Sequence, residues 1–381
     1  MLFIDFSCLS LHFIYGPDQY WKKFWIDMAV LYPNITFKLV AEEGNISLPN
    51  LPSNCEWIPI KIKKLSGFFA GSNAFANAVK PFLEGQNAVW ITNQITHMPD
   101  SDIQQLLWVD ELEWLKFPQW QFQSREEISR KDWQKRSKKL KHFASFSKHY
   151  AHLLNNDLDI PETSINIFAP FYDNDINPAS WAEKESIKTE YCKGNDFFVF
   201  AGDIHNRHHI ISLLKAYSIF KKWQKSSMQL VIMGNTTEHS ASILQVIESY
   251  KHRDDVLIIT DPDEQEKLKI LSAAYACLYT AESISLPITM PYAMKVGVPL
   301  IVSDIPNMRE WGLDHVLYAN AADETQIAEK MILLFKDETF RTLLVENATH
   351  FVQILSVDKS PASLLAMLHS LFPANFAATI K

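Results

Sequence analysis

Short apolar runs alternate with helical stripes of apolar residues through the second half of the chain, and this alternation limits the fold more than any other feature. Phe197–Ala201 is an apolar run, and the apolar residues from Ile210 to Tyr217 recur at helical spacing. The same pair of patterns repeats to about residue 334. The predicted strands are Phe197–Ala201, Leu230–Met233, Val256–Thr260, Cys277–Thr280, Leu300–Val302 and Val316–Tyr318. Such alternation predicts right-handed βαβ units and a parallel sheet.

Two of the helices in this half carry a start signal. Asp263 has Glu266 three residues later, and Asp323 has Gln326 in the same relation. An N-cap carboxylate accepts hydrogen bonds from the first-turn amides, and the residue three positions on can bond back. The helices are therefore predicted to begin at these two aspartates.

The first half alternates in the same style but less regularly. Helices are predicted around 20–32, 74–83 and 125–140, and strands at Leu2–Phe6, Thr36–Val40, Trp57–Ile60, Ala88–Ile91, Leu106–Val109 and Phe143–Phe146. Residues 176–195 are polar and charged without an apolar period, which is typical of a linker. We therefore predict an α/β protein of two doubly wound, Rossmann-like domains facing across a cleft. The first domain is expected at 1–175, the linker at 176–195 and the second domain at 196–381.

Composition excludes several classes of protein. The 36 basic and 44 acidic residues give a net charge of −8, whereas proteins that bind nucleic acid usually have a basic excess. Only 10 of the 381 residues are glycine, and neither GxGxxG nor GxxxxGK[ST] occurs. The four cysteines form no CxxC pair. Nucleic-acid partners, Rossmann dehydrogenases, P-loop NTPases and zinc ribbons are therefore not expected.

The N-terminal segment reads as a strand. Residues 1–10 have no basic start and carry Asp5 within an apolar stretch, so they do not resemble a signal peptide. The sequence has no apolar run of the roughly 18 residues that a membrane span needs. We expect a cytoplasmic protein.

The loop that follows Phe197–Ala201 is a candidate anion site. Open parallel sheets bind ligands beyond the carboxyl ends of their strands, and this loop leads into a helix whose first amides can face an anion. Arg207 could bind phosphate oxygens, and His208 could add a proton or a charge. The alternative is a solvated loop with a chance basic residue. His205 and His209 are four residues apart but have no partner at ligand spacing, so no metal is predicted.

The segment from Tyr279 to Ser303 is the most specific in the sequence. After the strand that ends at Thr280, a polar loop and a short helix lead to Gly297 and the next strand. Leu286-Pro287, Ala293-Met294 and Gly297-Val298-Pro299 resemble the donor-binding domain of the retaining GT-B glycosyltransferases. The loop at Phe198–His208 is similar to the strand, turn and basic residues of that group. Gly16 is similar to the glycine of its first loop.

The sequence departs from the family at charged positions. The two glutamates of the family, counted back from Ala293-Met294, are replaced by Ile284 and Tyr292, and Glu282 lies two residues early. Asp203 stands where the family has a basic residue, and His208 stands in place of a lysine.

The resemblance implies a metal-independent, retaining transfer of a sugar from a nucleoside diphosphate to an acceptor hydroxyl. No cofactor is implied, and the co-substrate would be a UDP- or GDP-linked sugar. The acceptor would be a glycan, a lipid or a polysaccharide precursor. The catalytic candidates are Asp110, which follows a predicted strand, and Glu282. The candidates for donor binding are Gly16, Arg207, His208, Ser285, Leu286, Thr289 and Tyr292.

Two alternatives follow from the departures. A catalytically inactive GT-B homologue could act as a binding or scaffold subunit, and an epimerase would convert the nucleotide sugar without an acceptor. Arg130–His142 holds seven basic residues on a predicted helix. It is either a solvated face or a peripheral contact with an anionic membrane that carries a lipid-linked acceptor.

Overall fold

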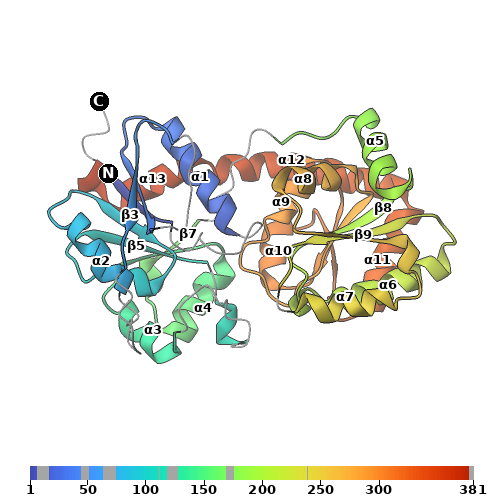
Figure 1. The fold of residues 1–381 in the computed structure, drawn as a ribbon, viewed down its shortest axis with the longest axis horizontal. Coiled ribbons are helices and arrows are strands. Elements are labelled where there is room, and N and C mark those ends of the chain that lie inside the picture. The colour runs from blue at the N-terminus through green and yellow to red at the C-terminus, as the bar shows by residue number, and fades with distance from the viewer. Residues whose placement is uncertain are drawn as a thin grey trace. The chain divides into compact units, whose positions relative to one another are not determined.

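The chain divides into two compact units, each built around one sheet. The computed structural model describes residues 1–6, 17–43, 51–62, 74–110, 112–117, 128–168, 176–237 and 239–376. One unit comprises Met1–Tyr172 with Asp358–Lys381, and the other comprises Asp173–Val357 (Figure 1). Each unit is described below by itself.

All strands described in the first unit are parallel. The sheet has the order β3-β2-β1-β4-β5-β6-β7. Its strands are β1 (Leu2–Asp5), β2 (Phe37–Glu42), β3 (Cys55–Ile60), β4 (Val89–Thr92), β5 (Gln104–Val109), β6 (His142–Ser145) and β7 (Ile165–Ile167). Its helices are α1 (Pro17–Leu31), α2 (Ala74–Leu83), α3 (Arg130–Ser137), α4 (Lys148–Leu158), α13 (Pro361–Leu371) and α14 (Pro373–Phe376), with single turns η2 (Ile95–His97), η3 (Glu113–Leu115) and η5 (Glu162–Ser164).

The second unit repeats this plan with the order β10-β9-β8-β11-β12-β13, again all parallel. Its strands are β8 (Phe197–Ala201), β9 (Gln229–Gly234), β10 (Val256–Thr260), β11 (Ala276–Tyr279), β12 (Leu300–Ser303) and β13 (Leu317–Ala319). Its helices are α5 (Trp181–Cys192), α6 (Ile210–Trp223), α7 (Ser240–Glu248), α8 (Glu264–Ala273), α9 (Thr289–Lys295), α10 (Pro306–Gly312), α11 (Glu324–Lys336) and α12 (Glu338–Asp358), with turns η6 (Asn206–His208) and η7 (Arg253–Asp255). The predicted class, two Rossmann-like α/β domains, is confirmed.

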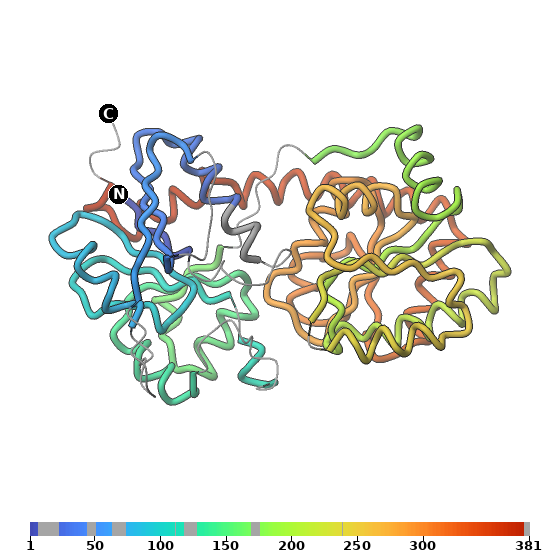
Figure 2. The backbone as a smooth tube through the Cα atoms, viewed as in Figure 1, coloured from blue at the N-terminus to red at the C-terminus, as the bar shows by residue number. Residues whose placement is uncertain are grey.

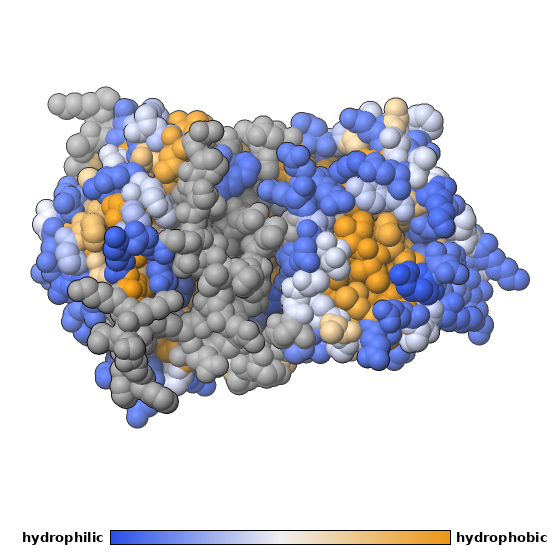
Figure 3. All heavy atoms as spheres, viewed as in Figure 1, coloured by the Kyte–Doolittle hydropathy of each residue, from blue (hydrophilic) through white to orange (hydrophobic). Residues whose placement is uncertain are grey.

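The cores lie between the sheets and their helices. In the second unit, Phe198 and Ile232 from the sheet pack in one fully buried cluster with Leu213 of α6 and Met331 of α11. Burying one such side chain contributes about 1.5–3 kcal/mol. The visible faces of both units are mostly hydrophilic, with a larger hydrophobic patch on the second unit (Figure 3).

The structure differs from the predicted domain boundaries in two places. Residues 181–192, within the expected linker, form α5, which begins at a capping box of Ser180 and Glu183 and packs on α8. The helix has no apolar stripe from which it could be predicted, because only Ile187 and Cys192 of its residues are buried. Residues 358–381 group with the first unit, to which the chain returns after α12 (Figure 2).

Smaller differences concern the first unit. The edge strand β7 was not predicted, because three residues are too few to show a period. The helix expected at 125–140 covers Arg130–Ser137, since Ser129 caps its start by accepting from the Asp132 amide. Residues 125–127 lie outside the described residues. Among the helices of the described ranges, none has the length and apolar character needed to cross a membrane.

Candidate active site

Two glycines bring the carboxyl ends of β8 and β9 into contact at the start of the candidate site. The Gly202 amide donates to the Met233 carbonyl at 3.1 Å, and the Ile204 amide donates to the Asn235 carbonyl at 2.9 Å. A Cβ atom on Gly234 would lie 1.6 Å from the Gly202 carbonyl oxygen. Only glycine at position 234 permits this approach, which fixes where the loop from Gly202 to His209 leaves the sheet.

The Arg207 guanidinium is held within this loop by Asp203. Arg207 Nη2 donates to Asp203 Oδ2 at 2.7 Å, and Asn235 Nδ2 donates to Asp203 Oδ1 at 3.0 Å. The side chains of Arg207 and Asp203 are only 16% and 12% exposed. Burial alone would raise the pKa of Asp203, but Arg207, His208 and the Asn235 hydrogen bond outweigh burial and keep this pKa below its usual range. Asp203 is therefore a buried carboxylate that forms an ion pair with Arg207.

His208 is a neutral residue that orients Arg207. Its Nδ1 lies 2.9 Å from the Thr280 carbonyl oxygen and must donate to it, which leaves Nε2 as the acceptor for Arg207 Nε at 3.3 Å. Burial, with the nearby charge of Arg207, lowers the pKa of His208 to about 3. The expectation that His208 brings a proton or a charge to an anion therefore differs from the structure, in which the ring links β11 to Arg207.

Glu282 lies beside the same loop. Its amide donates to the Arg207 carbonyl at 2.7 Å, and its Oε2 lies 2.9 Å from His209 Nε2. The Glu282 side chain is 38% exposed, so the carboxylate remains open to solvent. The structure thus brings together Arg207, His208 and Glu282, three of the residues singled out in the sequence.

The remaining donor-site candidates lie on the next loop and helix. Ser285 and Leu286 are buried, and Thr289 begins α9, where its hydroxyl donates to the Ala201 carbonyl at 3.4 Å. Tyr292 is half-buried on the same helix. Asn307 of α10 fixes this loop, because its Nδ2 donates to the carbonyls of Ile284 and Ser285 at 2.5 and 3.2 Å.

Two polar residues of this unit, Lys267 and Asn235, were not predicted as site residues, although their positions in the sequence could have indicated them. Lys267 shares a helical stripe with the buried Ile270 and Leu271, and its side chain is partly buried. Burial lowers the pKa of Lys267 to about 7, although Asp203 and Glu264 act in the opposite direction. Asn235 directly follows β9, which is the position where ligand-binding residues are expected.

The first unit has its own polar group at the carboxyl ends of β1, β4 and β5. Asp110 is 4% exposed and accepts a hydrogen bond from Asn93 Nδ2 at 2.7 Å. Asp5 accepts from the Thr92 hydroxyl at 2.6 Å and lies 2.7 Å from His97 Nδ1. The sequence pattern predicts only a strand around Asp5, although a carboxylate at the end of an apolar run also indicates a polar site. Gly16 lies outside the described residues.

No group of three or more His, Cys, Asp or Glu side chains that could hold a metal ion occurs within the residues that the structure describes.

The buried neutral state of His208 has a consequence for stability that can be measured. Its pKa of about 3 in the folded chain lies below the usual value of about 6.5, so between these values the unfolded chain binds more protons. Stability contributed by the neutral ring is therefore lost as the pH falls. His208→Gln removes this titration. Denaturant unfolding should show that the stability advantage of the wild type over the variant shrinks by about 2 kcal/mol from pH 7 to pH 5. Parallel pH profiles would contradict the neutral assignment.

Part of the second unit is similar to a known protein family. Residues 182–351 match the model of the family described as Glycosyl transferases group 1. The O-antigen chain mannosyltransferase RfbU of Salmonella typhimurium is 26% identical over 151 residues, which are 40% of this chain and 40% of that protein. The alignment thus spans less than half the length of this relative.

Several solved structures are similar to nearly the whole chain. Sucrose-phosphate synthase from Thermosynechococcus elongatus has a TM-score of 0.79 and 15% identity, covering 98% of this chain and 99% of that one. HepE of Anabaena, solved in complex with UDP and glucose, has a TM-score of 0.72 and 11% identity over 96% and 99% of the two chains. Residues 182–351 are thus similar to the group 1 glycosyl transferases, and the chain has the GT-B fold.

Proposed function

We propose that the protein transfers a sugar from a nucleoside diphosphate donor to a hydroxyl group of a glycan or a lipid-linked acceptor. One observation carries the proposal: Arg207 is fixed at the carboxyl end of β8, between Asp203 and the neutral ring of His208. A guanidinium held in this way is prepared to bind the oxygens of a phosphate. The family match and the O-antigen mannosyltransferase among the relatives support the assignment.

In the second unit, Arg207 would stabilise the negative charge that develops on the leaving diphosphate. The first amides of α6, a helix of 14 residues that begins at Ile210, would add the positive end of a helix dipole. Asp203 opposes this binding, so the diphosphate has to compete with it for Arg207. Glu282, with its exposed carboxylate and its contact to His209, would face the sugar. The buried loop at Ser285 and Leu286, with Thr289 and Tyr292, would hold the sugar and the ribose.

In the first unit, Asp110 would orient or deprotonate the acceptor hydroxyl. Its carboxylate is positioned by Asn93, and it lies at the end of β5, where open parallel sheets bind ligands. Retention of configuration, independence from metal ions and a UDP or GDP donor follow from the family resemblance and belong to this proposal. The complex of HepE with UDP and glucose supports the choice of a nucleoside diphosphate.

Calorimetric titration with UDP, GDP, ADP and CMP, each with and without magnesium, tests the donor site. We expect one nucleoside diphosphate to bind without magnesium, and its nucleoside alone to bind far more weakly, because the phosphate contacts are lost. Absence of binding across the panel would contradict the donor assignment and favour the inactive scaffold subunit. Product formed from the matching nucleotide sugar only with an acceptor identifies a transferase, whereas conversion without an acceptor identifies the epimerase.

Peripheral membrane contact through Arg130–His142 stays a prediction. In this stretch Lys131, Lys135, Lys138, Lys139 and Lys141 are exposed, as a lipid-facing surface would require. Cytoplasmic location is likewise part of the proposal.

A further inference from the structure

His209 connects the start of α6 to the loop that follows β11. Its Nε2 lies 2.9 Å from Oε2 of Glu282, and because a carboxylate only accepts hydrogen bonds, Nε2 must donate this one. The side chain of His209 is 22% exposed and that of Glu282 is 38% exposed, so the pair remains open to solvent. Ion pairs that remain open to solvent contribute little to stability. Stability alone therefore does not account for this contact.

The backbone of His209 has a conformation that favours glycine. Its φ angle is +50°, in the left-handed region, where residues with a side chain are uncommon and cost conformational free energy. His209 is the N-cap of α6, yet its side chain accepts no hydrogen bond from the amides of this helix, which the structure describes throughout. Residues held in such conformations cluster at active sites. The local fold of α6 therefore gives no reason for a histidine here, whereas its contact with Glu282 does.

The loop that carries Glu282 is fixed through its backbone to the loop that carries His209. The Thr280 hydroxyl donates to the His208 carbonyl at 2.6 Å, and the Glu282 amide donates to the Arg207 carbonyl at 2.7 Å. These bonds fix the backbone of Glu282 beside Arg207, but they leave the side-chain torsions of Glu282 free to take other rotamers. Among the residues that the structure describes, His209 is the only hydrogen-bonding partner of this carboxylate. His209 therefore sets the orientation of the carboxylate.

We propose that His209 is a positioning residue for sugar transfer, which holds Glu282 so that its other oxygen accepts a hydrogen bond from a hydroxyl group of the donor sugar. The inference rests on the proposed function, because it needs the diphosphate at Arg207 and the sugar beside it. Oε1 of Glu282 accepts no hydrogen bond from any part of the chain that the structure describes, and the side chain is partly exposed, so this oxygen can accept from a hydroxyl. A carboxylate held by one oxygen accepts at the other in a defined direction, and defined placement of the substrate accelerates its reaction.

Turnover, nucleotide binding and thermal unfolding of His209→Gly test the inference. Because glycine suits a positive φ angle and only a solvent-open ion pair is lost, the variant should unfold at about the same temperature as the wild type. The kcat of sugar transfer should fall at least about tenfold, since a misplacement of about 1 Å can cost a factor of about 100 in rate. Affinity for the nucleoside diphosphate, which lacks the transferred sugar, should change little. His209→Gln should restore most of the turnover, because its side-chain amide can donate in place of Nε2.

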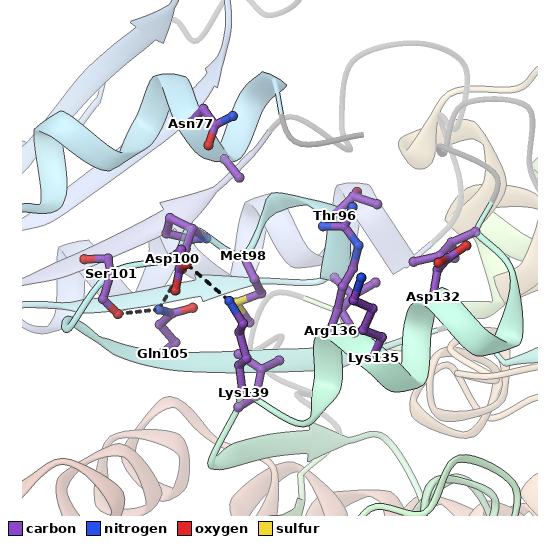
Figure 4. A pocket seen from close by; sticks show the side chains of 15 residues that line it. Asn77, Thr96, Met98, Asp100, Ser101, Gln105, Asp132, Lys135, Arg136 and Lys139 are labelled. Carbon is purple, nitrogen blue, oxygen red and sulfur yellow. Dashed lines mark hydrogen bonds and ion pairs between the residues drawn. The ribbon is translucent and has the colours of Figure 1, made fainter. Parts of the chain in front are cut away.

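Three further variants separate the role of His209 from simpler effects. In a Glu282→Ala background, His209→Gly should cause little further loss of turnover, as expected for two residues that act in one interaction. Lys193→Gly is the matched control for the backbone, since Lys193 is exposed at the end of α5 and has a φ angle of +55°. Asp100→Asn is the matched control for the ion pair, since it breaks the exposed pair of Asp100 with Lys139 at 3.2 Å, which lines a pocket of the first unit (Figure 4). Both controls should transfer sugar at the wild-type rate.

The outcomes distinguish this inference from the proposed function. Full turnover by His209→Gly, in a wild type that transfers sugar, would overturn the inference alone. A loss of nucleoside diphosphate affinity as large as the loss of turnover would also overturn it, because His209 would then bind the phosphate itself. An undiminished loss in the Glu282→Ala background, or lower unfolding temperatures of His209→Gly and His209→Gln together, would contradict it as well. Failure of the wild type to transfer any sugar would overturn the proposed function, and this inference with it.

Discussion

Arg207→Ala is expected to lower sugar transfer by about 100-fold or more and to weaken binding of the nucleoside diphosphate. Removing one preorganised donor from a developing negative charge typically costs a factor of about 10²–10³ in rate. The loss has a second cause here, because Asp203 would then lie buried beside the diphosphate without its main partner. Turnover by the variant, measured with the nucleotide sugar identified by calorimetry, gives the size of the effect.

Arg309→Ala is the matched control in the same unit. Arg309 also pairs with an aspartate, its Nη2 donating to Asp304 at 2.7 Å, but both side chains are exposed and lie outside the candidate site. Exposed ion pairs contribute about 0–1 kcal/mol, so this variant should keep both its stability and its activity. If Arg207→Ala retained full turnover as well, the phosphate would have to bind elsewhere.

Asp203→Asn should act in the opposite direction to Arg207→Ala. The substitution preserves the shape of the side chain, removes its negative charge and releases Arg207 from a 2.7 Å ion pair. We expect the nucleoside diphosphate to bind about tenfold more tightly or better, since a like charge near the ligand has been removed. Weaker binding would mean that Asp203 serves chiefly to orient Arg207.

The fold could be predicted because buried parallel strands and capped helices leave local signals. Phe197–Ala201 and Val256–Thr260 are strands with the predicted bounds. The first is buried throughout, as a continuous apolar run predicts, and the second is the partly buried edge strand, whose apolar run still marked it. Asp263 and Asp323 cap α8 and α11 as their spacing indicated. Helix α5 was not predicted. Most of its surface faces solvent, so its sequence lacks the apolar stripe by which a helix is recognised.

The residues of the candidate site could be found, but their roles could not. Arg207 and His208 could be predicted as site residues because they follow a predicted strand. That His208 is neutral depends on its burial and on the Thr280 carbonyl, which is 72 residues away in the chain. In the same way, Asp5 and His97 are brought together by the pairing of β1 with β4, which no local pattern expresses.

Gly234→Ala is expected to destabilise the second unit by about 3 kcal/mol or more, because overpacking against a rigid backbone costs more than overpacking against a side chain. The new Cβ atom would lie 1.6 Å from the carbonyl oxygen of Gly202 and 2.6 Å from its carbonyl carbon. Neither atom can move without breaking the hydrogen bonds between β8 and β9 at the centre of the sheet. Thermal unfolding should occur roughly 6–12 °C lower than in the wild type.

Gly202→Ala is the matched control, since it adds the same methyl group to the other partner of this contact. There the nearest atom is a ring carbon of Phe200 at 3.0 Å, and a side chain can shift by a few tenths of an ångström. We expect a loss below about 1.5 kcal/mol. If the two variants were equally stable, the contact between the two turns could not be as close as described. The hydrogen bond from Asn235 to Asp203, and through it the ion pair of Asp203 with Arg207, depends on this contact. Gly234→Ala should therefore also weaken nucleotide binding by the protein that remains folded.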